Sequence, residues 1–183
     1  MSVTVLRLGH RPQRDKRLTT HLILAARAFG AEKVIYSGVM DTKIEEGIRS
    51  VVKEWGGKFT LEYNENWRKI VKGFEGEVIH LTMYGLPVQD NIATLRDNPG
   101  RKLVIVGGSK VPREVYDEVD WNIAITSQPH SEVSALAVFL DLFFNNSELN
   151  KKFENPHLSI KPSERGKDVT ITQQRLSQTK EHN

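Results

Sequence analysis

The sequence has no cysteine among its 183 residues, and it has no long apolar run. The missing thiols exclude disulfide bonds, thiolate nucleophiles and zinc-thiolate sites. The longest largely apolar stretch, Val133–Leu140, is far shorter than the roughly 20 residues that a membrane-spanning helix needs. The N-terminal segment MSVTVLRLGHR lacks a basic region followed by an apolar one, so we expect no signal peptide and a cytoplasmic protein without a membrane contact.

Several motifs of catalytic and nucleotide-binding proteins are also missing. The pattern GxxxxGK[ST] is absent, and no predicted strand is followed by GxGxxG. No Ser-His-Asp arrangement stands out. His10, His21, His80 and His130 lie in different segments with no set of carboxylates beside them, so we predict no metal site and assign each histidine to the surface or to a hydrogen-bonded core position.

Positively charged residues cluster in two segments of the sequence. The net charge is only +3, and 38% hydrophobic with 27% charged residues is typical of a soluble globular protein. Positive charge gathers in the segment 7–17 (RLGHRPQRDKR), which has one acidic residue, and in the tail after Asn150. Two basic segments on a nearly neutral body favour a polyanionic partner, although basic surface loops are common without one.

Strands and helices alternate along the chain. We predict strands at 3–8, 33–37, 58–63, 77–84, 102–106 and 122–126, and helices from Thr19 or Thr20 to Gly30, at 42–55, 66–74 and 132–145, with helical segments after the strands at 77–84 and 102–106. This order indicates an α/β fold with a mostly parallel sheet and helices on both faces. Ligands of such sheets bind beyond the carboxyl ends of the strands, which here are 81–85, 107–110 and 127–131.

The segment 121–145 (WNIAITSQPHSEVSALAVFLDLFFN) combines such a loop with the most apolar helix. Pro129 interrupts the strand, and Ser131 is a good N-cap for the helix. The helix has two apolar stripes, so it either lies deep in a core or meets another chain. In a chain of this length we favour a subunit interface, and we expect Leu136, Leu140 and Phe144 to be largely buried only in a dimer.

The domain organisation follows from composition. We predict one domain at 1–150 and a basic extension at 151–183, which is loosely packed or ordered by a partner. Within this extension, 157–161 (HLSIK) and 168–172 (DVTIT) are expected to pair as a small hairpin.

Gly107 and Gly108 would allow a ligand close to the backbone, but a glycine pair alone more often marks a tight turn.

Four segments of the sequence are more informative about function: LRLGHRPQRDKRLTTH, VIHLTMYGLP, VIVGGSKVP and NIAITSQPHSEVSALAVFLD. Together, over about residues 3–145, they resemble the archaeal family of tRNA (cytidine-56)-2′-O-methyltransferases of the SPOUT superfamily.

This resemblance implies a SPOUT-type fold with a C-terminal trefoil knot, a homodimer through the helix 132–145, and S-adenosyl-L-methionine held by backbone groups of three loops. The substrate would be the T-loop of tRNA, methylated on the ribose 2′-hydroxyl. The implied RNA-binding residues are Arg7, Arg11, Arg14, Lys16 and Arg17. The implied cofactor-binding residues are Leu81, Val106, Gly107, Gly108, Ser109, Lys110, Ala124, Ile125, Thr126, Ser127, Gln128, Pro129, His130 and Ser131.

A ribose hydroxyl is a weak nucleophile that must lose its proton as the new bond forms. Related SPOUT enzymes use an arginine just inside the first helix, where this chain has Leu24. We therefore choose Arg14 as the catalytic residue, with Arg17 and His21 as substitutes, while each arginine could instead only hold a phosphate. Two other functions stay open: methylation of another RNA position or of a base, and RNA binding by a non-catalytic dimer.

Overall fold

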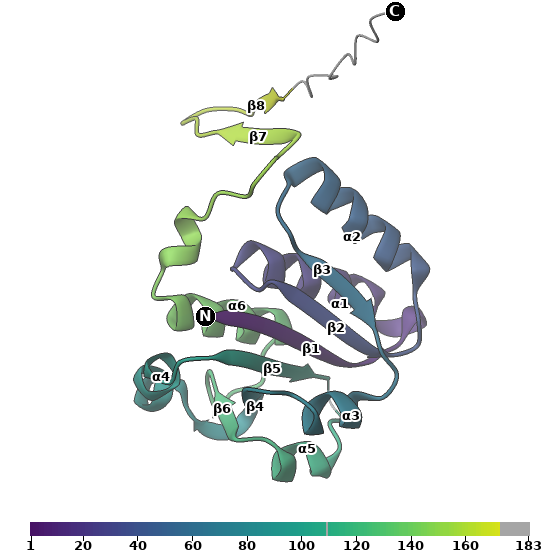
Figure 1. Ribbon diagram of the computed structural model, residues 1–183, viewed down its shortest axis with the longest axis vertical. Helices are drawn as coiled ribbons and strands as arrows, with labels where there is room; N and C mark the ends of the chain where they lie inside the picture. Colours follow the sequence, from purple (N-terminus) through teal and green to yellow (C-terminus); the bar gives the residue numbers. More distant parts are fainter. Residues whose placement is uncertain (109, 173–183) are drawn as a thin grey trace, which may run out of the picture.

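The protein is described from a computed structural model over residues 1–108 and 110–172. Six strands form one sheet in the order β3-β2-β1-β5-β4-β6, and all neighbouring strands are parallel (Figure 1). The strands are β1 (Ser2–His10), β2 (Lys33–Gly38), β3 (Thr60–Tyr63), β4 (Glu77–Pro87), β5 (Arg101–Gly107) and β6 (Trp121–Ala124). The helices are α1 (Pro12–Ala28), α2 (Thr42–Trp55), α3 (Trp67–Lys72), α4 (Val88–Asp97), α5 (Arg113–Glu118) and α6 (Glu132–Phe144), followed by a 3₁₀ turn η1 (Ser147–Asn150).

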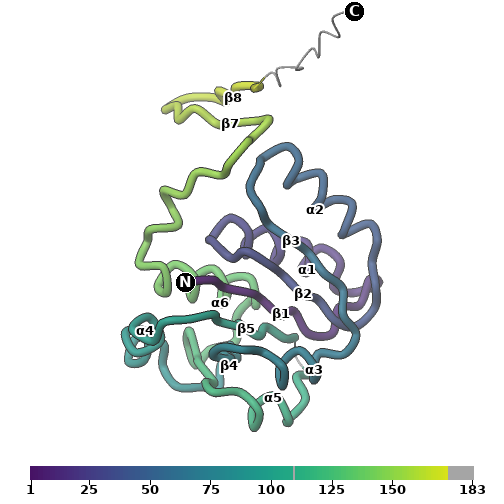
Figure 2. Tube along the Cα trace, in the orientation of Figure 1, coloured from purple at the N-terminus to yellow at the C-terminus, as the bar shows by residue number. Residues whose placement is uncertain are grey.

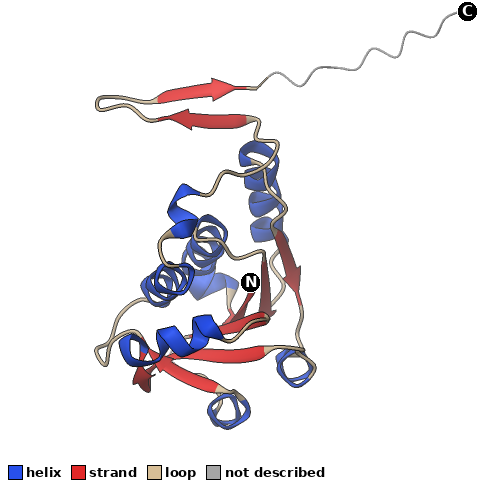
Figure 3. Ribbon diagram, turned by 60° about the vertical axis from the view of Figure 1, so that its left-hand side comes forward, coloured by secondary structure: helices blue, strands red, loops and turns tan. Residues whose placement is uncertain are grey.

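Helices cover both faces of the sheet (Figure 3). Side chains alternate along β1, so Val3 and Val5 face one core while Leu6 and Leu8 face the other. The first core is closed by α1, α2, α4 and α6, and the second by α3 and α5. The predicted parallel α/β fold is therefore confirmed. The trefoil knot stays a prediction.

The start of the first helix was predicted wrongly. The helix α1 begins at Pro12, not at Thr19 or Thr20, so the basic segment is mostly helical. Pro12 suits the first helical position because it lacks the amide hydrogen that would have no partner there. The buried side of α1 continues through the polar residues Asp15 and Thr19 before it reaches Leu22, and a search for apolar periodicity cannot detect those two turns.

The burial of α6 also corrects an expectation. Ser131 caps the helix as predicted, since its Oγ accepts a hydrogen bond from the Val133 amide at 3.2 Å. However, Leu136 and Leu140 are both 0% exposed within a single chain, and Phe144 is half-buried. The helix packs beside α1 and α4 over the sheet, so most of its apolar residues have partners inside the subunit, while Val138 stays 42% exposed. The presence of two apolar stripes is thus no evidence for a dimer.

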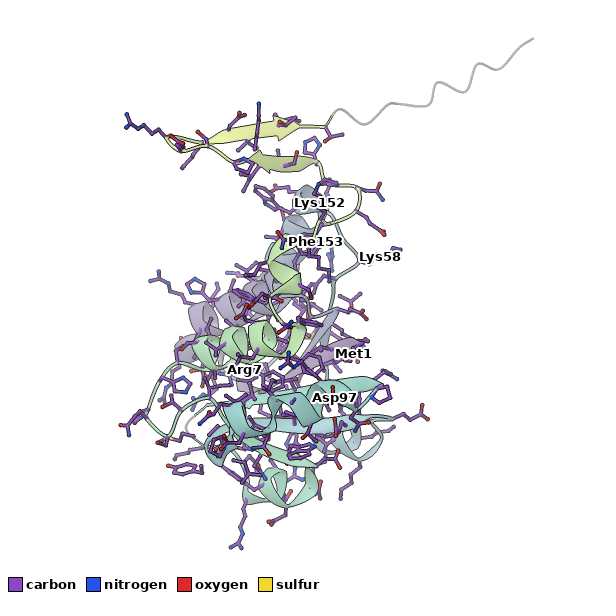
Figure 4. All side chains as sticks on the ribbon, turned by 90° about the vertical axis from the view of Figure 1, so that its left-hand side faces the viewer. Met1, Arg7, Lys58, Asp97, Lys152 and Phe153 are labelled. Carbon is purple, nitrogen blue, oxygen red and sulfur yellow. The ribbon has the colours of Figure 1, made fainter. Side chains whose placement is uncertain are left out.

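The extension after η1 runs past the end of α2 to a hairpin that stands apart from the sheet (Figure 2). Several contacts attach it, among them the hydrogen bond from the Gly57 amide to the Glu154 carbonyl at 2.8 Å and the Phe153 ring, labelled in Figure 4, which lies 4.2 Å from the Arg27 guanidinium. The predicted hairpin is confirmed as the antiparallel pair β7 (Leu158–Lys161) and β8 (Asp168–Ile171). Among the helices of residues 1–108 and 110–172, none is long and apolar enough to cross a membrane.

Candidate functional site

A cavity of about 670 Å³ lies at the carboxyl ends of β4, β5 and β6. This is the edge at which ligands bind parallel α/β sheets. The three segments that the sequence predicted all contribute to it, because parallel strands bring their ends to one side. The predicted cofactor residues in its wall are Leu81, Val106, Gly107, Gly108, Ile125, Pro129, His130 and Ser131.

Other predicted cofactor residues lie nearby without lining the cavity. Ala124 is buried at the end of β6, and Lys110 follows the glycine pair. Thr126, Ser127 and Gln128 are exposed in the loop after β6. Ser109 lies outside the described residues. The structure thus brings part of the predicted set together around one space and leaves part of it at the rim.

One wall of the cavity contains a buried, hydrogen-bonded histidine. His80 is 1% exposed, and its Nδ1 lies 2.9 Å from the Asn122 Oδ1. The Asn122 amide nitrogen donates to the Tyr116 carbonyl, so Oδ1 is the acceptor and His80 is protonated on Nδ1. Burial lowers the pKa of His80 and keeps the ring neutral. His80 is therefore the hydrogen-bonded core histidine that was predicted, and it additionally lines the cavity.

A buried ion pair lies beside the glycine loop. The Arg7 side chain is 1% exposed, its Nη1 donates to the Leu8 carbonyl at 2.6 Å, and its Nη2 lies 3.9 Å from the Glu132 Oε1. A Cβ atom added to Gly108 would lie 3.2 Å from that same oxygen. Burial raises the pKa of Glu132, and the Arg7 charge opposes this rise. A charged pair therefore adjoins an otherwise mostly apolar cavity.

The position of Arg7 overturns its predicted role in RNA binding. Residue 7 follows Val3 and Val5 on the same side of β1, so its side chain points into the core under α6 and not to the surface (Figure 4). Burial also lowers the pKa of this guanidinium. RNA phosphates cannot reach a side chain so enclosed.

Of the other basic residues, Arg11 is the N-cap of α1, and Arg14, Lys16 and Arg17 lie within this helix, which also reaches the cavity. Leu18 lines the cavity, and Arg14 precedes it by four residues, so the two share one helix face. Arg11 donates through Nε to the Asp15 carboxylate at 2.9 Å, and this bond lowers the pKa of Asp15. The side chain of Arg14 is 67% exposed. Lys16, Arg17 and His21 are exposed as well, but Arg17 points about 100° away from the Leu18 face.

Sequence reasoning missed several residues of the cavity. Leu18 and Tyr116 reach it from helices whose sides could not be oriented without the fold. Glu132 gave no signal, because an acidic residue in the first turn of a helix is already explained by the helix dipole. The remaining lining residues beyond the prediction are His80, Thr82, Met83, Tyr84, Val111 and Ala135.

Comparison with known proteins gives a consistent picture. A family model described as "tRNA ribose 2′-O-methyltransferase, aTrm56" matches residues 55–170. The chain is 51% identical to the tRNA (cytidine(56)-2′-O)-methyltransferase of Methanothermobacter thermautotrophicus over 170 residues, covering 91% of this chain and 95% of that protein. It is 50% identical to the protein of the same name from Pyrococcus horikoshii over 181 residues, covering 97% of this chain and 89% of that protein.

Solved structures share the fold at low sequence identity. An AdoMet-bound rRNA methyltransferase from Sinorhizobium meliloti superposes with a TM-score of 0.59 at 16% identity, covering 80% of this chain and 57% of that one. A TrmH/SpoU tRNA modifying enzyme from A. aeolicus gives a TM-score of 0.56 at 15% identity, covering 86% and 81%. These similarities show a SPOUT-type fold.

Proposed function

The chain belongs to the aTrm56 family of tRNA ribose 2′-O-methyltransferases, and we infer that it methylates the 2′-hydroxyl of cytidine 56 in the T-loop of tRNA. The observation that carries this function in the structure is the cavity at the ends of β4, β5 and β6, with Leu18 of α1 in its wall and Arg14 one turn earlier on the same helix face. A tRNA substrate makes the cytoplasm the expected place of action.

We propose that the cavity holds S-adenosyl-L-methionine, which supplies a methyl group on a positively charged sulfur. The residues present fit such a molecule, because most of the wall is apolar and Gly108 leaves space that a side chain would fill. Backbone groups at Leu81, Val106–Gly108 and Ile125–Ser131 would bind the nucleoside and the methionine part. We also include Lys110, Ser109 and Ala124 among the proposed cofactor-binding residues.

The arginines of α1 are proposed to bind and orient the RNA. Arg11, Arg14, Lys16 and Arg17 are exposed and would contact phosphates of the T-loop. Arg14 is the proposed catalytic residue, because it lies one helical turn from Leu18 in the cavity wall and can hold the target nucleotide beside it. Arg17 is a weaker candidate because its side chain points about 100° away from Leu18, and His21 is weaker because it lies after Leu18, away from the basic residues at the start of α1.

We also propose a homodimer through α6, on a narrower surface than the sequence suggested. The side of α6 that the subunit leaves open includes Ser134 and Val138, and Val138 is 42% exposed. Small residues such as Ser134 and Ala137 allow close approach of a second helix. This surface needs no contribution from the buried residues Leu136 and Leu140.

The decisive experiment uses radiolabelled S-adenosyl-L-methionine and an unmodified tRNA transcript. We expect label on the ribose of cytidine 56, where the modified linkage resists alkaline cleavage. Label on a base or at another nucleotide would favour the alternative methyltransferase function. Binding of tRNA without any label, and without cofactor binding by calorimetry, would favour a non-catalytic RNA-binding protein.

A further inference from the structure

Glu132 is the one carboxylate among the described residues that line the cavity. It stands at the first position of α6, next to Ser131, and its side chain is 19% exposed. Two histidines share the wall, but His80 is fixed inside the sheet by Asn122, and His130 is exposed with its Nδ1 at 3.1 Å from the Ser131 carbonyl. Glu132 is therefore the acidic group best placed to meet a ligand in the cavity.

The surroundings of Glu132 are unusual for an acid at the start of a helix. Its Oε1 approaches Arg7 only to 3.9 Å, which is too long for a hydrogen bond. The Arg7 Nε is buried and has no hydrogen-bond partner in the described part of the chain. A buried ion pair held this loosely adds little to stability. The arrangement instead leaves the Glu132 oxygens available to a group that enters the cavity.

Glu132 lies near the charged residues at the start of α1 that are proposed to bind RNA. The charges of Arg7 on β1, Asp15 on α1 and Arg11 at the N-cap of α1 all act on it. The face of α1 that carries Arg14 continues to Leu18 in the cavity wall. A ribose whose phosphate is held by Arg14 would thus lie near Glu132.

We propose that Glu132 accepts the proton of the ribose 2′-hydroxyl, and that the positive charge of Arg7 keeps Glu132 ionised. This inference rests on the proposed function. As the ribose oxygen bonds to the methyl carbon, the carbon–sulfur bond breaks with its electron pair going to sulfur, and the hydroxyl proton passes to the Glu132 carboxylate. The products are the methylated ribose, a neutral thioether and protonated Glu132, which returns its proton to water.

A carboxylate suits this task here because burial raises the pKa of Glu132 toward that of a useful base. The reaction needs the ionised form, so its rate should fall as the pH drops through the pKa of Glu132. Removing the Arg7 charge should raise that pKa further and move the falling part of the profile to higher pH.

The test compares Glu132→Gln and Glu132→Asp with the wild type, with Glu46→Gln as a control because Glu46 is an exposed glutamate in α2. Single-turnover methylation is measured at saturating cofactor and tRNA across pH, and cofactor affinity is measured by calorimetry. We expect Glu132→Gln to slow methyl transfer at least about 100-fold, with cofactor affinity within about threefold, and to lose the acidic fall of the profile. Glu132→Asp should retain part of the rate.

A second variant, Arg7→Met, should shift the acidic fall to higher pH, which a purely structural role of the pair would not do. A Glu132→Gln rate within about threefold of wild type would overturn the proposal. So would a tenfold weaker cofactor affinity with an unchanged rate, because Glu132 would then bind the cofactor's positive charge. Absence of ribose label with the wild-type protein would instead refute the proposed function itself.

Discussion

Arg14 is the basic side chain of α1 for which the helix geometry makes the sharpest prediction. It lies one turn before Leu18 among the basic residues at the start of α1, whereas Arg17 points about 100° away from Leu18 and His21 lies one turn after it. We expect Arg14→Ala to lower the rate of methyl transfer by about 100-fold, because the ribose loses its orientation. Arg17→Ala and His21→Ala should change it by less than about threefold at saturating tRNA. Equal losses in all three variants would contradict a special role for Arg14.

Two buried histidines should make stability depend on pH. Burial lowers the pKa of both His80 and His10 in the fold, so the unfolded chain binds protons more readily. Stability is therefore lost as the pH falls below the ordinary histidine pKa of about 6.5, and the loss continues down to the pKa of the folded state. We expect the melting temperature to decrease across this range.

The variant His80→Asn should weaken that decrease, since one buried titrating base is gone. His21→Asn is the matched control, because His21 is exposed. Burial also raises the pKa of Glu132 and Glu148, which acts in the opposite sense, but comparing variants at each pH removes this contribution. Parallel melting curves for wild type and His80→Asn would show that His80 is not a source of the dependence.

The strand β4 shows at the level of one element how the cavity is kept open. Leu81 and Leu86 both lie opposite Ile123 of β6, so the residues between them bulge out and place Thr82–Tyr84 in the cavity wall. A Cβ atom on Gly85 would lie 2.5 Å from the backbone of Asn122. The close approach of β4 to β6 at this bulge thus requires glycine.

We expect Gly85→Ala to destabilise the fold by about 1–3 kcal/mol and to weaken cofactor binding, because the alanine pushes β4 away from β6. Gly47→Ala is the control. It lies in α2 with nothing within 4 Å of the added atom, so it should stabilise the protein by about 0.5–1 kcal/mol. Chemical denaturation measures both effects, and a neutral Gly85→Ala would disprove the tight packing of the two strands.

Individual elements also show which features the sequence could predict. The bounds of α2 were predictable because Gly56 and Gly57 follow an amphipathic pattern. The first turns of α1 were not, since their buried side is formed by Asp15 and Thr19, whose burial depends on partners distant in sequence. The apolar α6 was correctly predicted as a helix, but whether neighbouring helices or a second subunit cover its faces is decided by packing that no local pattern contains.

At the scale of the whole molecule, too, part of the site could be predicted from the sequence and part could not. The three loops were predictable, because parallel strands must end at one edge. Arg7 and Glu132 were not recognised as a pair, since 125 positions separate them in the chain and only the fold brings β1 under α6. The resemblance to a known family named the reaction, whereas the direction of each side chain depends on the three-dimensional fold.

The distribution of exposed basic residues predicts how tRNA binding responds to salt. Bound phosphates release counterions, so affinity should fall steeply as the salt concentration rises. Removal of Arg11, Arg14, Lys16 or Arg17 singly should reduce the slope of log affinity against log salt by about one for each phosphate that the variant no longer binds. Arg7→Met should leave the slope unchanged, because Arg7 is buried. A flat salt response in the wild type would refute phosphate binding by this segment.

The proposed dimer gives the last prediction. We expect a dimeric mass at micromolar concentration, and Val138→Glu should shift it to the monomer by placing a charge in the interface. Val169→Glu is the matched control, because Val169 is similarly exposed, at 45% against 42%, but lies on the hairpin. Light scattering distinguishes the outcomes. A monomeric wild type would refute the dimer, and dissociation by Val169→Glu alone would indicate that the interface lies at the hairpin.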